Sequence, residues 1–167
     1  MGFAIPEKML AWRLYGEGME NFGDNDKPCE LPVPEIREDE LLVRIDAIGL
    51  CFSDVKLIRA GEAHPRVISK DLRKDPIIPG HEAVMTVVKV GSKLTGKFQV
   101  GQRYIIQADI YVNGKGFAYG YAINGGMDEK LKTQVGPCYA PITTDELTWD
   151  IVKPAYLRML DWLAGLY

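Results

Sequence analysis

The chain has little of several features that would assign it to a particular class of protein. It has no uninterrupted apolar stretch long enough to span a bilayer, and no basic segment followed by an apolar run at its N-terminus. With 20 Lys and Arg against 23 Asp and Glu, its net charge is -3, so no cationic excess favours phosphate backbones or anionic lipid. We therefore expect neither a membrane nor a nucleic-acid partner.

Cysteine is also scarce. The chain has three cysteines, Cys29, Cys51 and Cys138, and their odd number and wide spacing suit a reducing compartment better than a disulfide framework. We therefore expect a cytoplasmic protein. Hydrophobic residues make up 47% of the sequence, which allows one domain to bury a core without disulfides.

Strand patterns dominate the chain. The apolar residues of Lys8 to Leu14 are consistent with an opening strand, and strict alternation from Leu41 to Ala47 predicts a strand with one buried face. A β-branched run at residues 84–90 predicts another, and Asn-Gly pairs at 113–114 and 124–125 predict hairpin turns. Short strands separated by glycine turns indicate a mainly β fold, a small barrel or sandwich.

Helical signals are few. We expect a short helix near residues 54–58, followed by a charged loop from Gly61 to Pro76 that faces solvent by its composition. His64 lies in this loop and is expected to be a solvated histidine. Only residues 155–166, which follow Pro154, have apolar side chains at clear helical spacing, so we expect a C-terminal helix there.

Two distant stretches carry residue types that bind metals. Residues 49–54 contain Cys51, and residues 79–82 contain His81 and Glu82, with glycines and a proline that allow the two turns of chain to converge. We predict that Cys51, His81 and Glu82 hold one Zn²⁺ ion. A cysteine at the end of a strand is more often a small buried apolar residue, so the prediction depends on the three residues together.

The order of motifs along the chain resembles that of a known family. The motifs are Leu41–Asp54, Pro79–Ala83, Val87–Ser92 and Val100–Tyr104. Together they resemble the N-terminal catalytic domain of zinc-dependent medium-chain alcohol dehydrogenases, from about residue 8 to about residue 141. Within this family, residues 117–126 are most similar to the branch that acts on polyols and sugar phosphates, such as sorbose 1-phosphate.

The resemblance implies a fold and a division of the chain. It implies a mainly β, GroES-like fold, a partly open barrel with short helices, over residues 1–141. Residues 142–167 would be a C-terminal segment that leads toward a missing nucleotide-binding domain.

The resemblance also implies roles for individual residues. Zinc held by Cys51 and His81, with Glu82 as a direct or outer ligand, would promote hydride transfer between an alcohol or ketone and a nicotinamide. Ser53 matches the family's proton-relay hydroxyl, and Asp54 matches the carboxylate that orients the imidazole. Ser53 and Asp54 could instead only cap the helix that follows Cys51.

Three departures from the family limit these expectations. Residues 107–135 contain no cysteine, so we expect no structural zinc. Lys153 stands where the polyol branch commonly has a glutamate ligand, and an ammonium group there would weaken zinc binding. No strand, glycine-rich turn and helix follow in the order that binds NAD(P), so we expect that cofactor only through the missing domain, and an inactive chain on its own.

Three functions are consistent with the sequence. The first is the catalytic-domain fragment of a zinc-dependent, NAD(P)-linked dehydrogenase for a small alcohol, polyol or sugar phosphate. The second is a non-catalytic GroES-like binding module. The third is a self-assembling module. The terminal segment around Tyr156, Leu160, Trp162 and Leu163 would normally pack on the missing domain, and its exposed apolar face predicts a homo-oligomer.

Overall fold

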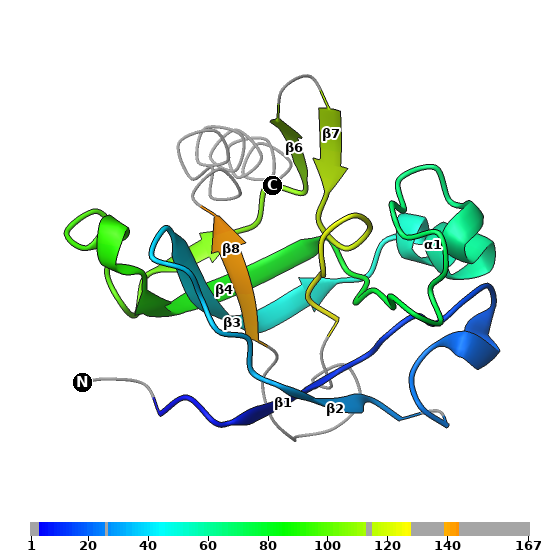
Figure 1. Cartoon of the computed structure of the whole chain (residues 1–167), viewed down its shortest axis with the longest axis horizontal. Helices are drawn as coiled ribbons and strands as arrows, with labels where there is room; N and C mark the ends of the chain where they lie inside the picture. The colour runs from blue at the N-terminus through cyan, green and yellow to red at the C-terminus, as the bar shows by residue number, and fades with distance from the viewer. Residues whose placement is uncertain (1–3, 26, 113–114, 128–138, 144–167) are drawn as a thin grey trace, which may run out of the picture.

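The protein is mainly β, as the sequence predicts. The computed structural model describes residues 4–25, 27–112, 115–127 and 139–143 (Figure 1). The strands are β1 (Lys8–Ala11), β2 (Cys29–Pro32), β3 (Glu40–Gly49), β4 (Glu82–Val90), β5 (Arg103–Ile105), β6 (Asp109–Val112), β7 (Lys115–Ala118) and β8 (Tyr139–Thr143). The helices are α1 (Phe52–Ala60) and three 3₁₀ turns, η1 (Met19–Asn21), η2 (Gly61–Ala63) and η3 (Ser92–Leu94).

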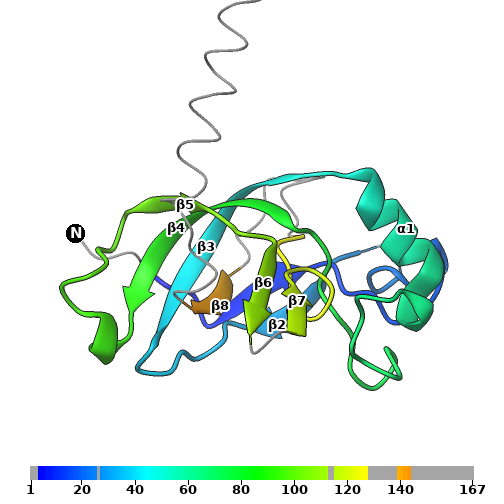
Figure 2. The same cartoon turned by 90° about the horizontal axis from the view of Figure 1, so that it is seen from above.

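The strands form three antiparallel groups. A central sheet has the order β5-β4-β3-β8, and β1-β2 and β6-β7 are two-stranded. In the described part of the chain these sheets do not close into a single barrel. Figures 1 and 2 both show the long strands β3 and β4 running through the middle of the molecule, with α1 beyond the end of β3.

The pairing of β3 with β4 determines where the predicted metal ligands lie. The strands are antiparallel, and Gly49 at the end of β3 pairs with Glu82 at the start of β4. The chain therefore leaves β3 and enters β4 at the same edge of the sheet. Register shifts after Leu42 and after Ile45 mark irregularities of the kind that increase strand twist.

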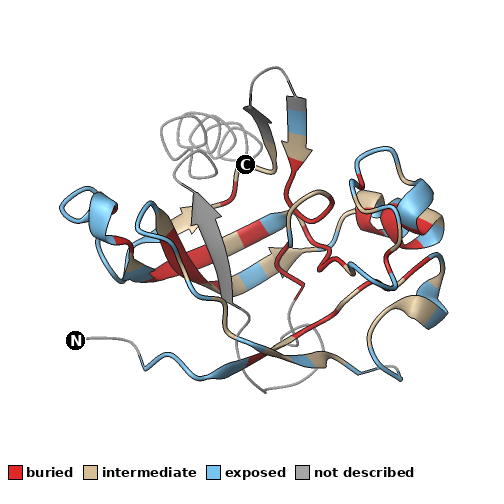
Figure 3. Ribbon diagram, viewed as in Figure 1, coloured by how far each residue is buried: buried red, intermediate tan, exposed pale blue. Residues whose placement is uncertain are grey.

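The hydrophobic core lies mainly on β3 and β4. The buried segments, red in Figure 3, run along both strands and continue into the segment before β4. The main cluster includes Leu41, Val43, Ile45, Met85 and Val87, each with no exposed surface. A second cluster, centred on Leu14, Leu57, Leu72 and Tyr121, packs α1 against the loop that follows it.

The loop from Gly61 to Pro76 differs from its prediction. Val67 is 7% exposed and Leu72 is 1% exposed, and both belong to the second core cluster. The expectation that the whole loop faces solvent was therefore wrong. Charged residues dominate the composition of the loop, but Val67 and Leu72 pack in the same cluster as apolar residues of α1.

The other predicted elements have mixed outcomes. The helix near residues 54–58 is confirmed and is longer, and β6 and β7 pair on either side of residues 113–114 as a hairpin. The second predicted hairpin, at 124–125, was wrong, because Asn124 and Gly125 bond to Ile78 and the next two residues bond to Gly80 and Pro79. The C-terminal helix, Lys153 and Cys138 lie outside the described residues.

No helix among the described residues has the length and apolar character needed to cross a membrane.

Candidate metal centre

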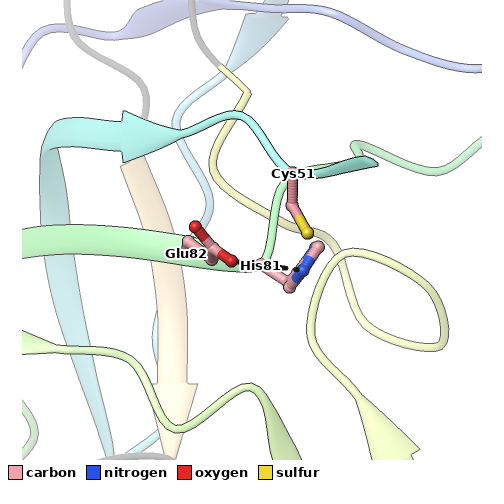
Figure 4. A group of neighbouring side chains, drawn as sticks. All are labelled: Cys51, His81 and Glu82. Carbon is pink, nitrogen blue, oxygen red and sulfur yellow. Dashed lines mark ion pairs between the residues drawn. The ribbon is translucent and has the colours of Figure 1, made fainter. Parts of the chain in front are cut away.

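Three predicted ligands meet where β3 ends and β4 begins. Cys51 precedes the first residue of α1, His81 precedes β4, and Glu82 is the first residue of β4. One ligand atom from each residue lies within 4.8 Å of the others. Figure 4 shows the Cys51 sulfur and the His81 ring side by side, with the Glu82 carboxylate next to them. The structure therefore brings together residues that are thirty positions apart in the sequence.

Asp54 holds two of these residues in place. Its Oδ2 accepts a hydrogen bond from the Cys51 backbone N–H at 2.9 Å, and its Oδ1 lies 3.1 Å from Nδ1 of His81. Asp54 is 3% exposed, so a carboxylate at this depth needs both partners. Because the carboxylate accepts from Nδ1–H, Nε2 of His81 is left with its lone pair toward the other ligands.

The ligand group is open on one side. The His81 side chain is 13% exposed, whereas the Glu82 side chain is 54% exposed and its Oε1 lies 3.9 Å from Nε2 of His81. A Cβ atom at Gly49 would lie 2.6 Å from Oε2 of Glu82. Glycine at the end of β3 therefore leaves the room that the Glu82 carboxylate occupies.

Backbone packing on one side supports the position of His81. Gly80 has φ of +95°, a left-handed conformation that glycine adopts without steric cost. Gly126 and Met127 donate backbone hydrogen bonds to Gly80 and Pro79, each at 3.0 Å. A Cβ at Gly125 would lie 2.3 Å from the Gly80 carbonyl oxygen, so only glycine allows this approach. The segment 125–127 thus supports the turn that presents His81.

Ser53 lies beside the ligand group. Its Oγ is 3.2 Å from Sγ of Cys51, which places the hydroxyl within hydrogen-bond range of the sulfur. Ser53 is half-buried and belongs to the first turn of α1. The structure thus places all five predicted site residues at one location.

Sequence reasoning missed Tyr121, which packs against the ligand group. Its ring centroid lies 5.5 Å from that of His81 and 5.0 Å from that of His64. Burial, followed by the negative charge of Asp54, raises the pKa of Tyr121, although a hydrogen bond with Ser53 and the charge of Arg66 lower it. Its position three residues after Ala118, the end of β7, gave no periodic signal.

His64 is not the solvated histidine that was expected. It is half-buried, and its ring packs on Tyr121. Burial, followed by the positive charges of Arg66 and Lys56, lowers its pKa below the ordinary value of 6.5. The expectation was wrong because the loop folds back over Tyr121 instead of extending into solvent.

Comparisons with known proteins identify the family of the chain. Residues 37–139 match the family described as the alcohol dehydrogenase GroES-like domain. The chain belongs to this family of zinc-dependent medium-chain alcohol dehydrogenases. The resemblance predicted from the sequence is confirmed, and the mainly β fold agrees with it.

Two curated relatives are enzymes of polyols or sugar phosphates by name. Sorbitol dehydrogenase of Bombyx mori is 48% identical over 86 residues, which are 51% of this chain and 23% of that protein. L-sorbose 1-phosphate reductase of Klebsiella pneumoniae is 36% identical over 115 residues, 67% of this chain and 26% of that protein. The chain thus spans about a quarter of the length of these relatives.

A third relative has a different kind of name. The PFL-like enzyme TdcE of Escherichia coli (strain K12) is 55% identical over 47 residues, which are 28% of this chain and 6% of that protein. This match is shorter than the other two and covers a much smaller part of the relative. It does not bear on the family, which the match over residues 37–139 shows.

Solved structures show the same fold. A zinc-binding dehydrogenase of Sinorhizobium meliloti 1021, solved with NADP, has a TM-score of 0.63 at 22% identity over 84% of this chain and 38% of that one. A thermostable alcohol dehydrogenase of Pyrobaculum aerophilum, solved with cobalt and zinc, has a TM-score of 0.60 at 21% identity over 82% and 40%. At these identities the likeness concerns the fold alone.

Proposed function

We propose that the chain is the catalytic-domain part of a zinc-dependent, NAD(P)-linked dehydrogenase that acts on a small alcohol, polyol or sugar phosphate. The observation that carries the proposal is the approach of ligand atoms from Cys51, His81 and Glu82 to within 4.8 Å of one another. Membership of the alcohol dehydrogenase family supports it, as does the hydrogen bond from His81 to Asp54.

The donor set fits zinc. A thiolate, an imidazole nitrogen and a carboxylate are the ligand types that Zn²⁺ binds in proteins, and three protein ligands with an open position are typical of catalytic sites. Such an ion, when bound, supplies a Lewis acid that polarises a substrate oxygen. The exposed side of Glu82 is where a small molecule would reach the site.

The surrounding residues would orient the ligands and move a proton. Asp54 keeps the proton of His81 on Nδ1, and therefore holds Nε2 in the form that can bind a metal. Ser53 is suited to accept a proton from a substrate hydroxyl, because its own hydroxyl lies at the edge of the group. Tyr121 packs against the His81 ring at a tilt of 46°, with the ring centroids 5.5 Å apart, and so helps to fix the orientation of that ring.

The nicotinamide and the substrate class come from the relatives. One neighbour of known structure contains NADP, and two relatives are named for sorbitol and for L-sorbose 1-phosphate. By analogy we propose an NAD(P)-linked reaction on a molecule of this kind. We also propose a cytoplasmic protein and the division at residue 141, with residues 142–167 as a separate segment.

A metal titration of the full chain tests the proposal. We expect zinc to bind at one site per chain, and more weakly than in enzymes with a fourth protein ligand, because Lys153 would replace a carboxylate. The measurement is competition with a chelating dye on carefully purified protein. Protein that contains no zinc and takes none up would contradict the proposal.

Exposed apolar side chains favour a second candidate function, that of an assembly module. Leu50 is 66% exposed and Phe52 is 65% exposed, although both flank the ligand group. Two exposed apolar side chains of this size, one on each side of Cys51, would suit contact with another protein if they form one patch. Sedimentation at several concentrations should then reveal a dimer or larger assembly, and a monomer throughout the range would count against this candidate.

A further inference from the structure

Arg66 lies close to the ligand group without belonging to it. Its guanidinium carbon is 5.7 Å from the centroid of the Tyr121 ring, and that ring is 5.5 Å from the ring of His81. One aromatic ring therefore separates a permanent positive charge from a predicted zinc ligand. Arg66 also pairs with Asp109 of β6 at 2.9 Å.

The positive charges of Arg66 and Lys56 both act on His64. The His64 ring packs on Tyr121 at 5.0 Å, and Arg66 and Lys56 are the charged groups that affect the His64 titration. The carboxylate that faces Arg66 is Asp109. His64 and Arg66, two groups that can donate hydrogen bonds to an anion, thus both contact the Tyr121 ring.

A pocket opens beside Arg66. It has a volume of about 220 Å³, and its walls include Arg66, Asp109, Ile68 and Phe117. The side chains of Arg66 and Asp109 are 50% and 44% exposed, so their ion pair is exchangeable with solvent and with other anions. The planar fork of an arginine binds two oxygens of a phosphate at once, which a single carboxylate oxygen does not match.

We propose that Arg66 and His64 bind the phosphate of a phosphorylated polyol whose hydroxyl end reaches the Cys51, His81 and Glu82 group. This inference depends on the proposed dehydrogenase function and selects one of its three substrate classes. Arg66 leaves Asp109 for the phosphate, and Tyr121 lies along the carbon chain between the two ends of the substrate. Lys56 adds positive charge without a direct contact.

Binding of the full chain to four probes tests the proposal. The probes are sorbitol 6-phosphate, sorbitol, inorganic phosphate and NADP⁺, each titrated calorimetrically with and without zinc. We expect sorbitol 6-phosphate to bind at least about tenfold more tightly than sorbitol, because a charge-assisted bidentate pair adds that much affinity. Inorganic phosphate should compete with it. Equal affinity for the two polyols would overturn the proposal.

The metal-free titration separates this inference from the proposed function. The phosphate contacts involve no zinc ligand, so phosphate binding should persist without zinc. The hydroxyl end of the substrate would lose its contact with the metal, so the preference for sorbitol 6-phosphate over inorganic phosphate should shrink. If the chain binds no zinc but keeps phosphate binding at Arg66, the dehydrogenase proposal is lost, and of this inference only the phosphate contact with Arg66 stands. If NADP⁺ alone binds through Arg66, the site serves a nucleotide and the inference is wrong.

Variants assign the contact to named residues. Arg66→Gln should remove most of the preference for the phosphorylated polyol, and His64→Gln should reduce it less. Asp109→Asn releases Arg66 and should tighten phosphate binding. Arg103→Gln is the matched control, because Arg103 forms a comparable ion pair with Asp46. An Arg66→Gln protein that is folded and retains the full preference would overturn the proposal, as would weaker binding by Asp109→Asn.

Discussion

Cys51 and Cys29 have similar hydrogen-bond partners but differ in the residues that lie beyond those partners. Both are half-buried, and each has a hydroxyl in contact with its sulfur, that of Ser53 at 3.2 Å for Cys51 and that of Tyr15 at 3.3 Å for Cys29. Neither thiol is distinguished by its burial or by its nearest hydrogen-bond partner. The second layer of neighbours makes the difference.

Cys29 lies in a two-stranded sheet with no metal-binding partner described nearby. It pairs with Ala11 across β1 and β2, and its contact with Tyr15 helps to raise the pKa of that phenol, after the larger effect of burial. Cys51 follows β3, where the register with β4 brings in His81 and Glu82. A cysteine therefore becomes a candidate ligand through strand pairing, and not through its own exposure.

The largest expected difference is in the zinc affinity of two variants, each of which lacks one of the two thiols. Cys51→Ser removes the soft donor of the site, so zinc affinity should fall by at least about 100-fold. Cys29→Ser should leave zinc affinity unchanged, because no other ligand lies beside it. Chelator competition measures both variants. Equal losses of zinc affinity in the two variants would contradict the assignment of Cys51 as the zinc ligand.

Replacing the carboxylate that supports Cys51 and His81 should have the next largest effect. Asp54→Asn weakens the hold on both residues, and outer partners of this kind are worth about 10–100-fold in metal affinity. Asp46→Asn is the matched control, since Asp46 is a carboxylate of β3 with a side chain 7% exposed and no predicted ligand among its partners. The control should bind zinc as the unmodified protein does.

A third prediction concerns the turn that precedes His81, where Gly80 is crowded by its neighbours. Gly80 and Gly96 both have positive φ, but a Cβ at Gly80 would lie 2.9 Å from Cγ of Met127, whereas nothing lies within 4 Å of one at Gly96. Gly96→Ala should cost about 1 kcal/mol for its conformation alone. Gly80→Ala should cost about 1–3 kcal/mol more from overpacking, and it should weaken zinc binding. Chemical denaturation measures both costs, and equal values would contradict this view of the turn.

The smallest expected effect is on the free energy of unfolding, through the ionisation of Asp46 at low pH. Burial raises the pKa of this carboxyl, but hydrogen bonds from Thr86 and Arg44, with the charges of Arg44 and Arg103, lower it overall from 3.8. A depressed pKa stabilises the folded state above the unfolded value, and this stability is lost as the pH falls through the folded value. Asp46→Asn should therefore cost about 1 kcal/mol at neutral pH and less below pH ~3.8. A cost that stays constant down to the lowest pH would argue against this ionisation.

The part of the site on β3 and β4 was predictable from the sequence. Alternation from Leu41 to Ala47 predicted β3, and the motif order placed Cys51 after it and His81 before the next long strand. Because an antiparallel pair puts the end of one strand beside the start of the next, those two facts together implied the meeting point. The observed pairing of Gly49 with Glu82 is the outcome of that register.

The layer around Tyr121 was not predictable in the same way. Its contacts with His64 and Arg66 join residues more than fifty positions apart, and no periodic pattern connects them. The available signal was the glycine-rich sequence around it. A Cβ at Gly120 would lie 2.9 Å from the backbone nitrogen of Gly80, so the residue before Tyr121 packs directly against the residue before His81. The Asn-Gly pair at residues 124–125 predicted a hairpin there, which was wrong.

X-ray absorption at the zinc edge of the metal-loaded full chain would show whether Cys51, His81 and Glu82 bind one ion together. Zinc bound by Cys51, His81 and Glu82 should show one sulfur at about 2.3 Å together with nitrogen and oxygen at about 2.0–2.2 Å, including the outer-ring scattering of one imidazole. A shell with no sulfur, with two sulfurs, or without imidazole scattering would contradict the claim that Cys51, His81 and Glu82 form a single zinc site.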